Sequence, residues 1–430
     1  MASALYPRGV SPQRPTVQVV GRRLDPGDHQ LRDYLSRADQ PFEFHEHDSP
    51  AARVLLARHG IVEPRLPVVV DGERVFEAAT LGALLEAWGF SQTPRHASYD
   101  TAVVGGGPAG LAAAMYAASA GFSTVLVERD VPGGQAAHTS VIENYLGFPE
   151  GVTGSRLLRL AGRQTEGFGG EIVMLREVTT LDQDGDGSVR FTLEGGIEVT
   201  AAVAIVAPGI DWRRLDVEGV NELLGRGVYY GAGRGEAALC EGEDVVVVGA
   251  GNSAAQAVLN LADAGARVTM CVRGETLGRT TTDYLVARIE RHPLIDVQLS
   301  TQLCELHADD EHLRAVTIEV ASGTQERKPA DRLFLCIGGE PRTGWAEAGG
   351  VRTDRTGYIL TGPDLLERGR RPESWPLDRD PLALETSVPG VFAAGDVRHG
   401  SIKRVAGAVG EGAMAALLAQ HRLEEIVASG

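Results

Sequence analysis

Apolar runs alternate with glycine-rich turns and helix-like stretches along most of the chain. One run and its turn read Thr101-Ala-Val-Val-Gly-Gly-Gly-Pro-Ala-Gly110, and a second pair reads Asp244-Val-Val-Val-Val-Gly-Ala-Gly-Asn-Ser-Ala254. Each is a strand pattern that leads into a tight turn and then into an alanine-rich helix pattern, as in parallel sheets. The sequence therefore predicts an α/β fold with two Rossmann-like dinucleotide-binding domains.

The first ninety residues show a different pattern. Residues 1–14 are expected to form a flexible tail, residues 15–92 a small α/β domain, and the polar residues 93–98 a linker. In the small domain the pattern predicts, in chain order, strand Thr16–Val20, helix Asp28–Ala38, strand Phe42–His45, helix Pro50–Arg58, strand Val68–Val70 and helix Leu81–Trp88.

Composition and charge narrow the class of protein. The 430 residues suggest two to four domains, and the 54 glycines suggest many tight turns. A formal net charge of −17 opposes binding to nucleic acid or to an anionic membrane, because their phosphates repel an acidic protein. No apolar run is long enough to span a bilayer, and Met1 to Pro15 lacks the apolar core of a signal peptide. We therefore expect a cytoplasmic protein.

In the first fingerprint each glycine has a distinct expected role. Gly105 permits the tight turn, Gly107 lets the backbone approach a pyrophosphate, and Gly110 allows close packing of helix on strand. Pro108 and Ala109 begin the helix, whose first amides would face the phosphates. Strand Ser123–Val127 ends at Glu128, close to the offset of about 20 residues expected for the acid that binds ribose.

The second fingerprint has the same glycines with one permitted change. Gly249 and Gly251 correspond to the first two glycines, and Ala254 takes the third place after Asn252 and Ser253. Strand Arg267–Val272 ends at Arg273, where a carboxylate would favour NAD and a cation suits the 2′-phosphate of NADP. With Arg279 as a second cation, the sequence favours NADPH over NADH, and a solvated surface arginine is the alternative.

The cysteines form no redox or metal motif. The four lie far apart in sequence, at Cys240, Cys271, Cys304 and Cys336. Cys271 and Cys336 lie within apolar runs and are expected to be inert core thiols, and Cys304 is expected to be packed as well. Cys240 lies in a polar stretch and is the one candidate for a reactive thiol.

Residues 99–425 carry further motifs that resemble the low-molecular-weight thioredoxin reductase family of FAD-dependent enzymes. Gly133-Gly134-Gln135 and the stretch from Ile142 through Asn144 to Pro149 look like the flavin-side loop of that family. The stretch from Thr386 to Val397, which contains Gly395 and Asp396, is similar to its carboxyl-terminal FAD motif. The resemblance implies FAD bound by the first fingerprint together with Gly134, Gln135, Asn144, Gly395 and Asp396.

The same resemblance implies how the domains are connected. Arg404, Val405 and Ala406 fall where the family places a helix start against the flavin ring, with Arg404 in place of the usual glutamine. Ala207-Pro208-Gly209 and Ile337-Gly338 match the two crossings between domains. The expected FAD-binding domain is therefore split into 99–215 and 341–430, with the NAD(P)H-binding domain at 216–340, in a homodimer.

The chain departs from this family at its redox dithiol. Gly231 and Arg234 occupy the positions of the Cys-x-x-Cys pair, and neither residue can form a thiolate or store electrons. We therefore expect an NAD(P)H-dependent FAD enzyme that passes electrons to an external acceptor, such as a redox protein, a small disulfide, a quinone or oxygen. Two alternatives stay open, a flavin- or nucleotide-binding sensor without catalysis and a thioredoxin reductase that uses a thiol from elsewhere, Cys240 included.

Two histidines lie beside the flavin motifs. His138 follows the Gly-Gly-Gln loop and His399 follows the carboxyl-terminal motif, so either is a candidate proton donor, although a structural role is the simpler interpretation for both. Hydride transfer itself requires no acid–base pair from the protein, since the cofactors supply the chemistry.

Residues 15–90 resemble the glutaredoxin/thioredoxin fold. Pro67 stands before the expected third strand, where that family has a proline that is usually cis. The dithiol of that family would follow the first strand, and this chain has Leu24-Asp25-Pro26-Gly27-Asp28 there. The resemblance implies a docking or regulatory module without thiol chemistry, and a generic α/β appendage is the alternative.

Overall fold

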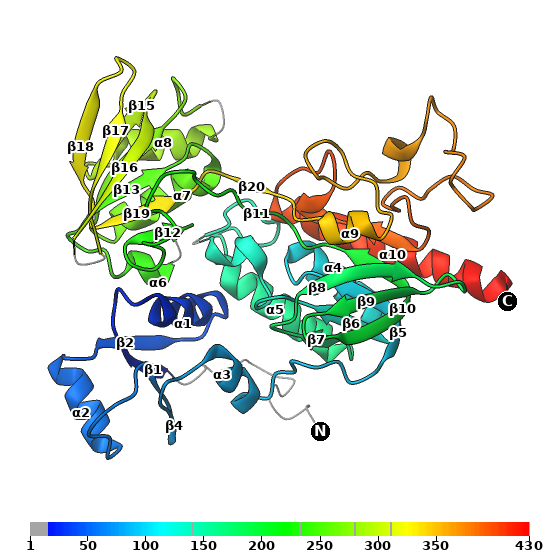
Figure 1. Ribbon diagram of the computed structural model, residues 1–430, viewed down its shortest axis with the longest axis horizontal. Coiled ribbons are helices and arrows are strands. Elements are labelled where there is room, and N and C mark those ends of the chain that lie inside the picture. The colour runs from blue at the N-terminus through cyan, green and yellow to red at the C-terminus, as the bar shows by residue number, and fades with distance from the viewer. Residues whose placement is uncertain (1–15, 140, 232–233, 279–280, 310–311, 430) are drawn as a thin grey trace.

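The computed structural model describes residues 16–429 except 140, 232–233, 279–280 and 310–311. The tail expected at 1–14 and the predicted site residue Arg279 lie outside this part of the chain. Figure 1 shows three units that meet around a central region. We call them the amino-terminal unit (16–92), the first fingerprint unit (98–212 and 339–429) and the second fingerprint unit (213–338).

The amino-terminal unit is a four-stranded sheet with the order β2-β1-β3-β4. Strands β1 and β2 are parallel, and β3 is antiparallel to β1. The expected elements are present with ends shifted by at most two residues, the Leu66–Pro67 peptide is cis, and β4 is an addition that the pattern did not predict. The bounds are β1 Val17–Gly21, α1 Pro26–Arg37, β2 Phe42–Glu46, α2 Pro50–Arg58, β3 Val68–Asp71, β4 Arg74–Phe76 and α3 Leu81–Ala87.

Helix α1 has a strong start signal. The side chain of Asp25 accepts hydrogen bonds from the backbone N–H groups of Gly27 and Asp28, and Pro26 takes the first helical position, where a missing N–H has no consequence. Leu31, Tyr34 and Leu35 face inward and are buried. In Figure 1 this helix lies directly below α6 of the second fingerprint unit and to the left of α5.

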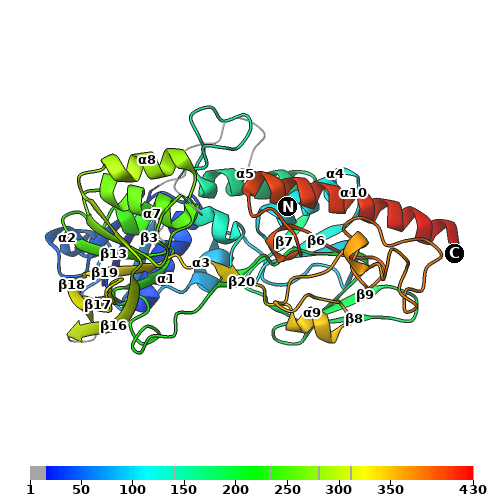
Figure 2. The same cartoon turned by 90° about the horizontal axis from the view of Figure 1, so that it is seen from above.

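The first fingerprint unit contains a seven-stranded sheet. Six of its strands have the order β7-β6-β5-β10-β9-β8, and the seventh, β21, pairs with β10. Because β21 pairs with β10 in parallel, the end of the chain returns to the sheet begun near residue 98. Helices α4, α5 and α10 lie along one face of the sheet (Figure 2). The strands are β5 Ser98–Val104, β6 Thr124–Val127, β7 Glu171–Val173, β8 Val178–Gln183, β9 Val189–Leu193, β10 Ile197–Val206 and β21 Val391–Ala393. The helices are α4 Pro108–Ser119, η2 Gly134–His138, α5 Gly154–Gly167, α9 Gly344–Ala348, η3 Gly362–Leu365, η4 Gly395–Val397 and α10 Val405–Ser429.

The second fingerprint unit combines a parallel five-stranded sheet, ordered β12-β19-β13-β14-β15, with an antiparallel sheet ordered β16-β17-β18. Strand β14 has the predicted bounds, and the pairing of β13 with β14 is parallel as a Rossmann-like unit requires. The strands are β12 Val228–Tyr230, β13 Asp244–Val248, β14 Arg267–Val272, β15 Ile295–Leu299, β16 Gln302–Asp309, β17 His312–Glu319, β18 Gln325–Pro329 and β19 Arg332–Leu335. The helices are α6 Arg234–Ala237, α7 Asn252–Asp263 and α8 Asp283–Arg291.

Two short strands connect the fingerprint units. β11 (Asp211–Trp212) and β20 (Gly339–Glu340) pair antiparallel at the two chain crossings. Asp211 forms ion pairs with both Arg129 and Arg342, which fixes one crossing to the first fingerprint unit. No helix of the described part of the chain is both long and apolar enough to cross a membrane.

The amino-terminal unit and the first fingerprint unit share one apolar core. Leu31 and Leu35 of α1 belong to the same cluster of buried side chains as Leu158 of α5 and Ile172 of β7. The end of the amino-terminal unit is also held in place, since the backbone N–H of Met174 donates to the carbonyl of Ser91 over 3.0 Å. Burial of this shared surface fixes the position of α1 beside the central region.

Candidate functional site

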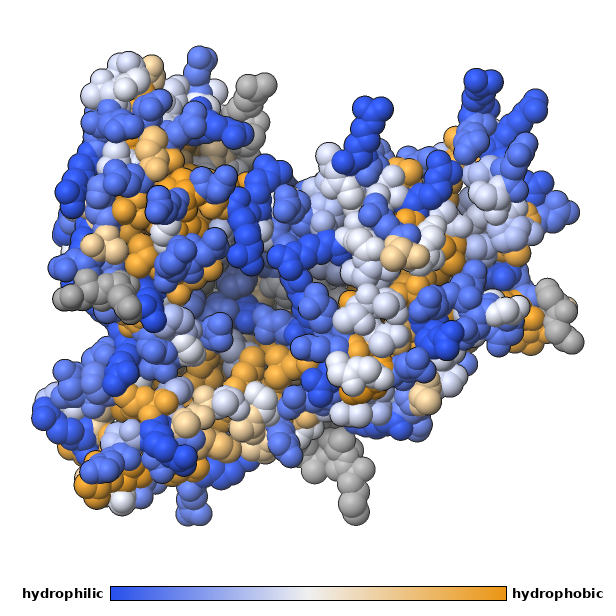
Figure 3. Space-filling model, viewed as in Figure 1, coloured by the Kyte–Doolittle hydropathy of each residue, from blue (hydrophilic) through white to orange (hydrophobic). Residues whose placement is uncertain are grey.

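A cavity of about 580 Å³ lies where the three units meet. Figure 3 shows the surface hollowed in this region. Its size is within the range of cofactor sites. Its walls include these residues that the sequence predicted for the site: Gly105, Gly107, Pro108, Ala109, Glu128, Gly134, Gln135, Ser253, Gly395, Asp396, Arg404 and Val405.

The first fingerprint shapes the cavity through its glycines. Gly105 has φ of +100°, and a Cβ there would overlap the carbonyl oxygen of Ala207. A Cβ at Gly110 would overlap the carbonyl of Gly105, so this glycine lies behind the cavity and allows the close packing of α4. At Gly107 a Cβ would meet no atom within 4 Å, and no side chain caps the amides of α4 at this point. A phosphate therefore has open access to the start of the helix.

Glu128 lies at the end of β6, where the spacing predicted it. Its carboxylate accepts hydrogen bonds from the backbone N–H groups of Gly106, over 2.5 Å, and Asp130, over 2.9 Å. Burial raises the pKa of this carboxyl, against the lowering effect of the two N–H donors. The side chain is thus fixed in orientation beside the turn that would hold the phosphates.

Asp396 lies opposite the first fingerprint, in η4. Among the described residues no hydrogen-bond donor contacts its carboxylate, and burial raises its pKa. A half-buried carboxylate without a donor is unfavourable unless a ligand or water supplies one. Its neighbour Gly395 is fixed by the hydrogen bond of its N–H to Glu411 over 2.8 Å. The side chain is therefore oriented for a ligand with hydroxyl groups.

The flavin-side loop is only partly at the cavity. Gln135 lines it and donates through Nε2 to the carbonyl of Ile210 over 2.6 Å. Asn144 and Ala406, which the resemblance placed at the flavin, are both exposed and do not line the cavity. Arg404 lines it at the start of α10 while remaining largely exposed.

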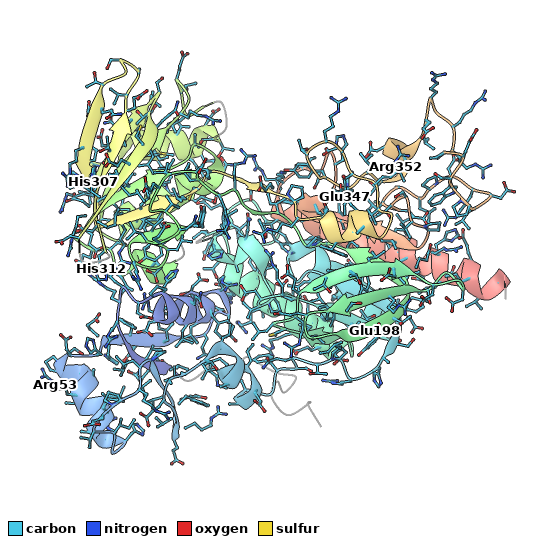
Figure 4. All side chains as sticks on the ribbon, viewed as in Figure 1. Arg53, Glu198, His307, His312, Glu347 and Arg352 are labelled. Carbon is cyan, nitrogen blue, oxygen red and sulfur yellow. The ribbon has the colours of Figure 1, made fainter. Side chains whose placement is uncertain are left out.

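The two histidines differ in position. His138 lines the cavity, and its Nδ1 lies 3.5 Å from a carboxylate oxygen of Asp33. Burial lowers the pKa of His138, which favours the neutral imidazole at neutral pH. His399 pairs with Asp354 over 2.8 Å and does not line the cavity. His307 and His312 lie on the sheet at the outer edge of the second fingerprint unit (Figure 4).

The second fingerprint repeats the geometry of the first. Gly249 has φ of +149°, and a Cβ there would overlap the carbonyl oxygen of Cys336, whereas a Cβ at Gly251 would meet nothing within 4 Å. Asn252 orients the next loop by accepting the N–H of Thr282 over 2.8 Å. The following residue, Ser253, lines the central cavity.

Other predicted residues of this fingerprint lie farther from the cavity. Ala254 is buried in α7, and Arg273 is exposed just beyond the end of β14, without lining the central cavity. One crowded turn followed by one open helix start is nevertheless present in each of the two fingerprints.

Gly231 lies at the cavity in a backbone conformation that suits glycine. Its φ is +73°, and a Cβ there would lie 3.2 Å from Cζ2 of Trp212, tighter than ordinary contact. Both residues line the cavity. Arg234 begins α6, and its side chain lies outside the described part of the chain. The first position of the expected dithiol is thus a glycine covered by an indole ring.

The structure corrects two predictions about thiols. Cys240 is buried, its thiol contacts the carbonyl oxygen of Glu236, and burial raises its pKa to about 12, so it is not a reactive thiol. Cys304 is exposed rather than packed, because it alternates with buried Leu303 along β16. Burial of Cys271 and Cys336 is confirmed, and it raises the pKa of each to about 12.

Three residues of α1 line the cavity and were not predicted. They are His29, Asp33 and Arg37. Burial would raise the pKa of Asp33, but the charges of Arg37 and His138 outweigh it and lower that pKa. No local pattern could have identified these residues, because the contacts join segments that lie far apart in sequence. Trp212 and Tyr230 of the cavity wall were missed for the same reason.

Glu236 connects α1 with the second fingerprint unit. Its carboxylate accepts from Nδ1 of His29 over 3.0 Å and from a guanidinium nitrogen of Arg332 over 3.0 Å, and Nε of Arg32 lies 3.5 Å away. Arg32 and Arg332 are each only 1% exposed. Burial would raise the pKa of Glu236, but His29 and the two arginines lower it to about 2. The carboxylate is therefore charged at neutral pH.

Comparison with known proteins assigns residues 99–412 to a family described as pyridine nucleotide-disulphide oxidoreductase. The chain is 33% identical to a thioredoxin reductase of Bacillus subtilis (strain 168) over 331 residues, 76% of this chain and 96% of the relative. It is 32% identical to that of Treponema pallidum (strain Nichols) over 333 residues, 76% and 98% of the two chains.

Solved structures agree with this assignment. A thioredoxin reductase of Lactococcus lactis aligns with a TM-score of 0.67 and 30% identity, and that of T. acidophilum with 0.66 and 28%. Each alignment covers 76% of this chain and 99% of the solved chain. The family match begins at residue 99 and therefore leaves out the amino-terminal unit.

We predict that Glu236→Gln lowers the free energy of unfolding by about 3–5 kcal/mol at neutral pH, because it leaves two buried arginines without their shared anion. A depressed carboxyl pKa stabilises the fold above the ordinary value of 4.5, and the contribution is lost as the pH falls toward about 2. Chemical denaturation between pH 7 and 3 should show the difference from wild type narrowing below about pH 4.5.

The control is Glu326→Gln, which removes the anion of a more exposed pair with Lys328. This variant should lose less than about 1 kcal/mol. Equal effects of the two variants, or a difference that does not change with pH, would contradict the role given to Glu236.

Proposed function

The chain belongs to the pyridine nucleotide-disulphide oxidoreductase family, and on this basis we propose that it passes electrons from NADPH through FAD to an external acceptor without an internal dithiol. Membership makes it an NAD(P)H-dependent flavoprotein oxidoreductase of the thioredoxin reductase-like kind. The acceptor and the absence of a dithiol step are the proposed part.

The residues at the central cavity fit FAD. Gly107 leaves open the space in front of α4 that a pyrophosphate needs, Glu128 is oriented beside it, and Asp396 lacks a donor that a ribityl hydroxyl can supply. Gln135 and Arg404 would lie on the flavin side. When bound, FAD supplies the reversible uptake of two electrons. The chain contributes orientation and walls that exclude water.

The second fingerprint fits a pyridine nucleotide. Gly251 leaves the start of α7 open in the same way, and Ser253 reaches the central cavity. Exposed Arg273, just after β14, is placed to pair with a 2′-phosphate. These features support NADPH as the donor.

The observation that carries the proposal is the pairing of Gly231 with Trp212. A thiol at position 231 would need a left-handed backbone and would lie against the indole ring. The cysteines that the chain does have cannot replace it, since Cys240, Cys271 and Cys336 are buried and Cys304 lies on β16, outside the wall of the central cavity. Electrons therefore have no thiol to pass through at the central cavity.

We infer that the amino-terminal unit is a thioredoxin-like module without a dithiol. The sheet order β2-β1-β3-β4, with β1 and β2 parallel and β3 antiparallel, supports this inference. Asp25 precedes α1 and Pro26 begins it, where that family has its cysteines, and Asp25 caps the helix instead. Such a module can dock on a surface and has no redox chemistry of its own.

Anaerobic mixing tests the proposed function. NADPH should bleach the flavin absorbance within seconds, and NADH should do so more slowly, because Arg273 would recognise the extra phosphate. Stopped-flow absorbance measures both reactions. A flavin that stays oxidised with either nucleotide would rule out the enzyme and favour a binding protein.

Arg273→Ala should weaken NADPH binding about tenfold, or about 1.4 kcal/mol, and leave NADH binding unchanged. The Kd of each nucleotide can be measured by fluorescence titration. The matched control is Arg267→Ala at the start of the same strand, where Asp244 pairs with the arginine, and it should change neither Kd. The same loss for both nucleotides would refute the assignment of Arg273.

Restoring the cysteines should not restore dithiol chemistry. Gly231→Cys with Arg234→Cys should unfold about 1–2 kcal/mol more easily than wild type, owing to the positive φ at 231, and should show no reduction of thioredoxin by NADPH. Gly185→Cys serves as the control, because a Cβ there meets no atom within 4 Å. Rapid thioredoxin reduction by the double variant would contradict this explanation.

A further inference from the structure

The amino-terminal unit covers the face of the second fingerprint unit that carries α6. His29 of α1 pairs with Glu236, and its ring lies 4.6 Å from the ring of Tyr229 on β12. Pro26 lies so close to Gly225 that a Cβ at Gly225 would be 2.7 Å from its Cα. Residues on both sides of Gly231 are therefore in contact with α1.

Further contacts extend this cover along the second fingerprint unit. Arg23 donates to the carbonyl oxygen of Leu239 over 3.3 Å and pairs with Glu243 over 2.9 Å. The partners of Arg23 and His29 thus span the segment from Glu236 to Glu243. A protein acceptor could reach this face only after the amino-terminal unit had moved away.

The same unit is fixed on its other side to the first fingerprint unit. Arg37 pairs with Asp130 over 2.9 Å, and Asp39 pairs with Arg159 over 2.8 Å. Together with the shared apolar core, these contacts hold α1 between the two fingerprint units. The amino-terminal unit is therefore an integral part of the fold, and its displacement would expose apolar surface to water.

A second cavity of about 320 Å³ remains between α1 and the first fingerprint unit. It shares Asp33, Arg37, His138 and Thr139 with the central cavity, so the two are adjacent. Its volume lies at the lower end of the range of small-molecule sites. Its other wall residues are Ser36, Asp39, Gln40, Pro41, Ala137, Thr153 and Ser155.

Nine of the eleven residues that line this second cavity are polar or charged. Residues with a hydroxyl group lie on both sides, Ser36 on α1 and Thr139, Thr153 and Ser155 on the first fingerprint unit. The charged groups Asp33 and Arg37 pair with each other over 2.7 Å where the two cavities adjoin. These side chains can form hydrogen bonds with a small hydrophilic molecule.

We propose that the second cavity binds the electron acceptor, and that this acceptor is a small hydrophilic molecule rather than a protein. The proposal rests on the proposed function and names the class of its acceptor. In the net reaction NAD(P)H gives two electrons as a hydride, one proton comes from solvent, and the acceptor leaves with two added hydrogens. Asp33, Arg37 and His138 would orient the acceptor where the cavities adjoin.

The test separates the two half-reactions. Ser36→Phe fills the second cavity from α1, Ser36→Ala removes only the hydroxyl, and Arg53→Phe places the same ring on α2, which Figure 4 shows on the far side of the amino-terminal unit. Stopped-flow absorbance measures bleaching by NADPH and then reoxidation by cystine, by 1,4-benzoquinone and by oxidised thioredoxin. Saturation-transfer NMR with cystine measures binding without turnover.

We expect Ser36→Phe to bleach at the wild-type rate but to be reoxidised at least tenfold more slowly by cystine or 1,4-benzoquinone, with loss of the cystine NMR signal. Arg53→Phe should match wild type, and Ser36→Ala, which loses one hydroxyl but keeps the cavity open, should lie between wild type and Ser36→Phe. Faster reoxidation by thioredoxin than by the small molecules, or wild-type behaviour of Ser36→Phe, would overturn the proposal. Absence of bleaching in every variant would instead refute the proposed function, and cystine binding that Ser36→Phe abolishes would still support the cavity.

Discussion

The arrangement of the molecule depends on one buried carboxylate. Glu236 lies between basic side chains from two units, with His29 and Arg32 on α1 and Arg332 on β19. A buried ion pair often adds little net stability over apolar packing, but removal of one partner is strongly unfavourable, so it specifies which surfaces meet. Here it fixes α1 beside the central cavity and thereby determines which residues surround any ligand there.

Around that fixed point, steric exclusion by glycines prepares two sites of the same kind. Gly105 and Gly249 each lie where a Cβ would overlap a carbonyl oxygen of a neighbouring loop, and Gly107 and Gly251 each leave open space before a helix. The crowded glycine fixes the tight turn, and the open glycine leaves the amides at the start of the helix accessible to a ligand. Because the same backbone geometry occurs twice, the glycine patterns in the sequence are enough to indicate a family that binds two nucleotides.

The features that could be predicted from the sequence are those with a local physical cause. The fingerprint turns, Glu128 after its strand and the bounds of α2 and β14 depend on residues near one another in the chain. The polar neighbours of Cys240 gave a false impression of exposure, since tertiary packing decides burial. Trp212 over Gly231 and His29 against Glu236 could not be predicted, because these partners meet only after three separate sheets have packed together.

The apolar cluster that runs from Leu35 of α1 to Leu158 of α5 has a consequence for the limits of the folding unit. The family match begins at residue 99, yet one apolar core contains residues from both sides of that point. A chain that began at residue 99 would expose part of this apolar cluster to solvent, and exposed apolar patches promote self-association. Residues 16–92 are thus expected to unfold together with the first fingerprint unit, although the family match leaves them out.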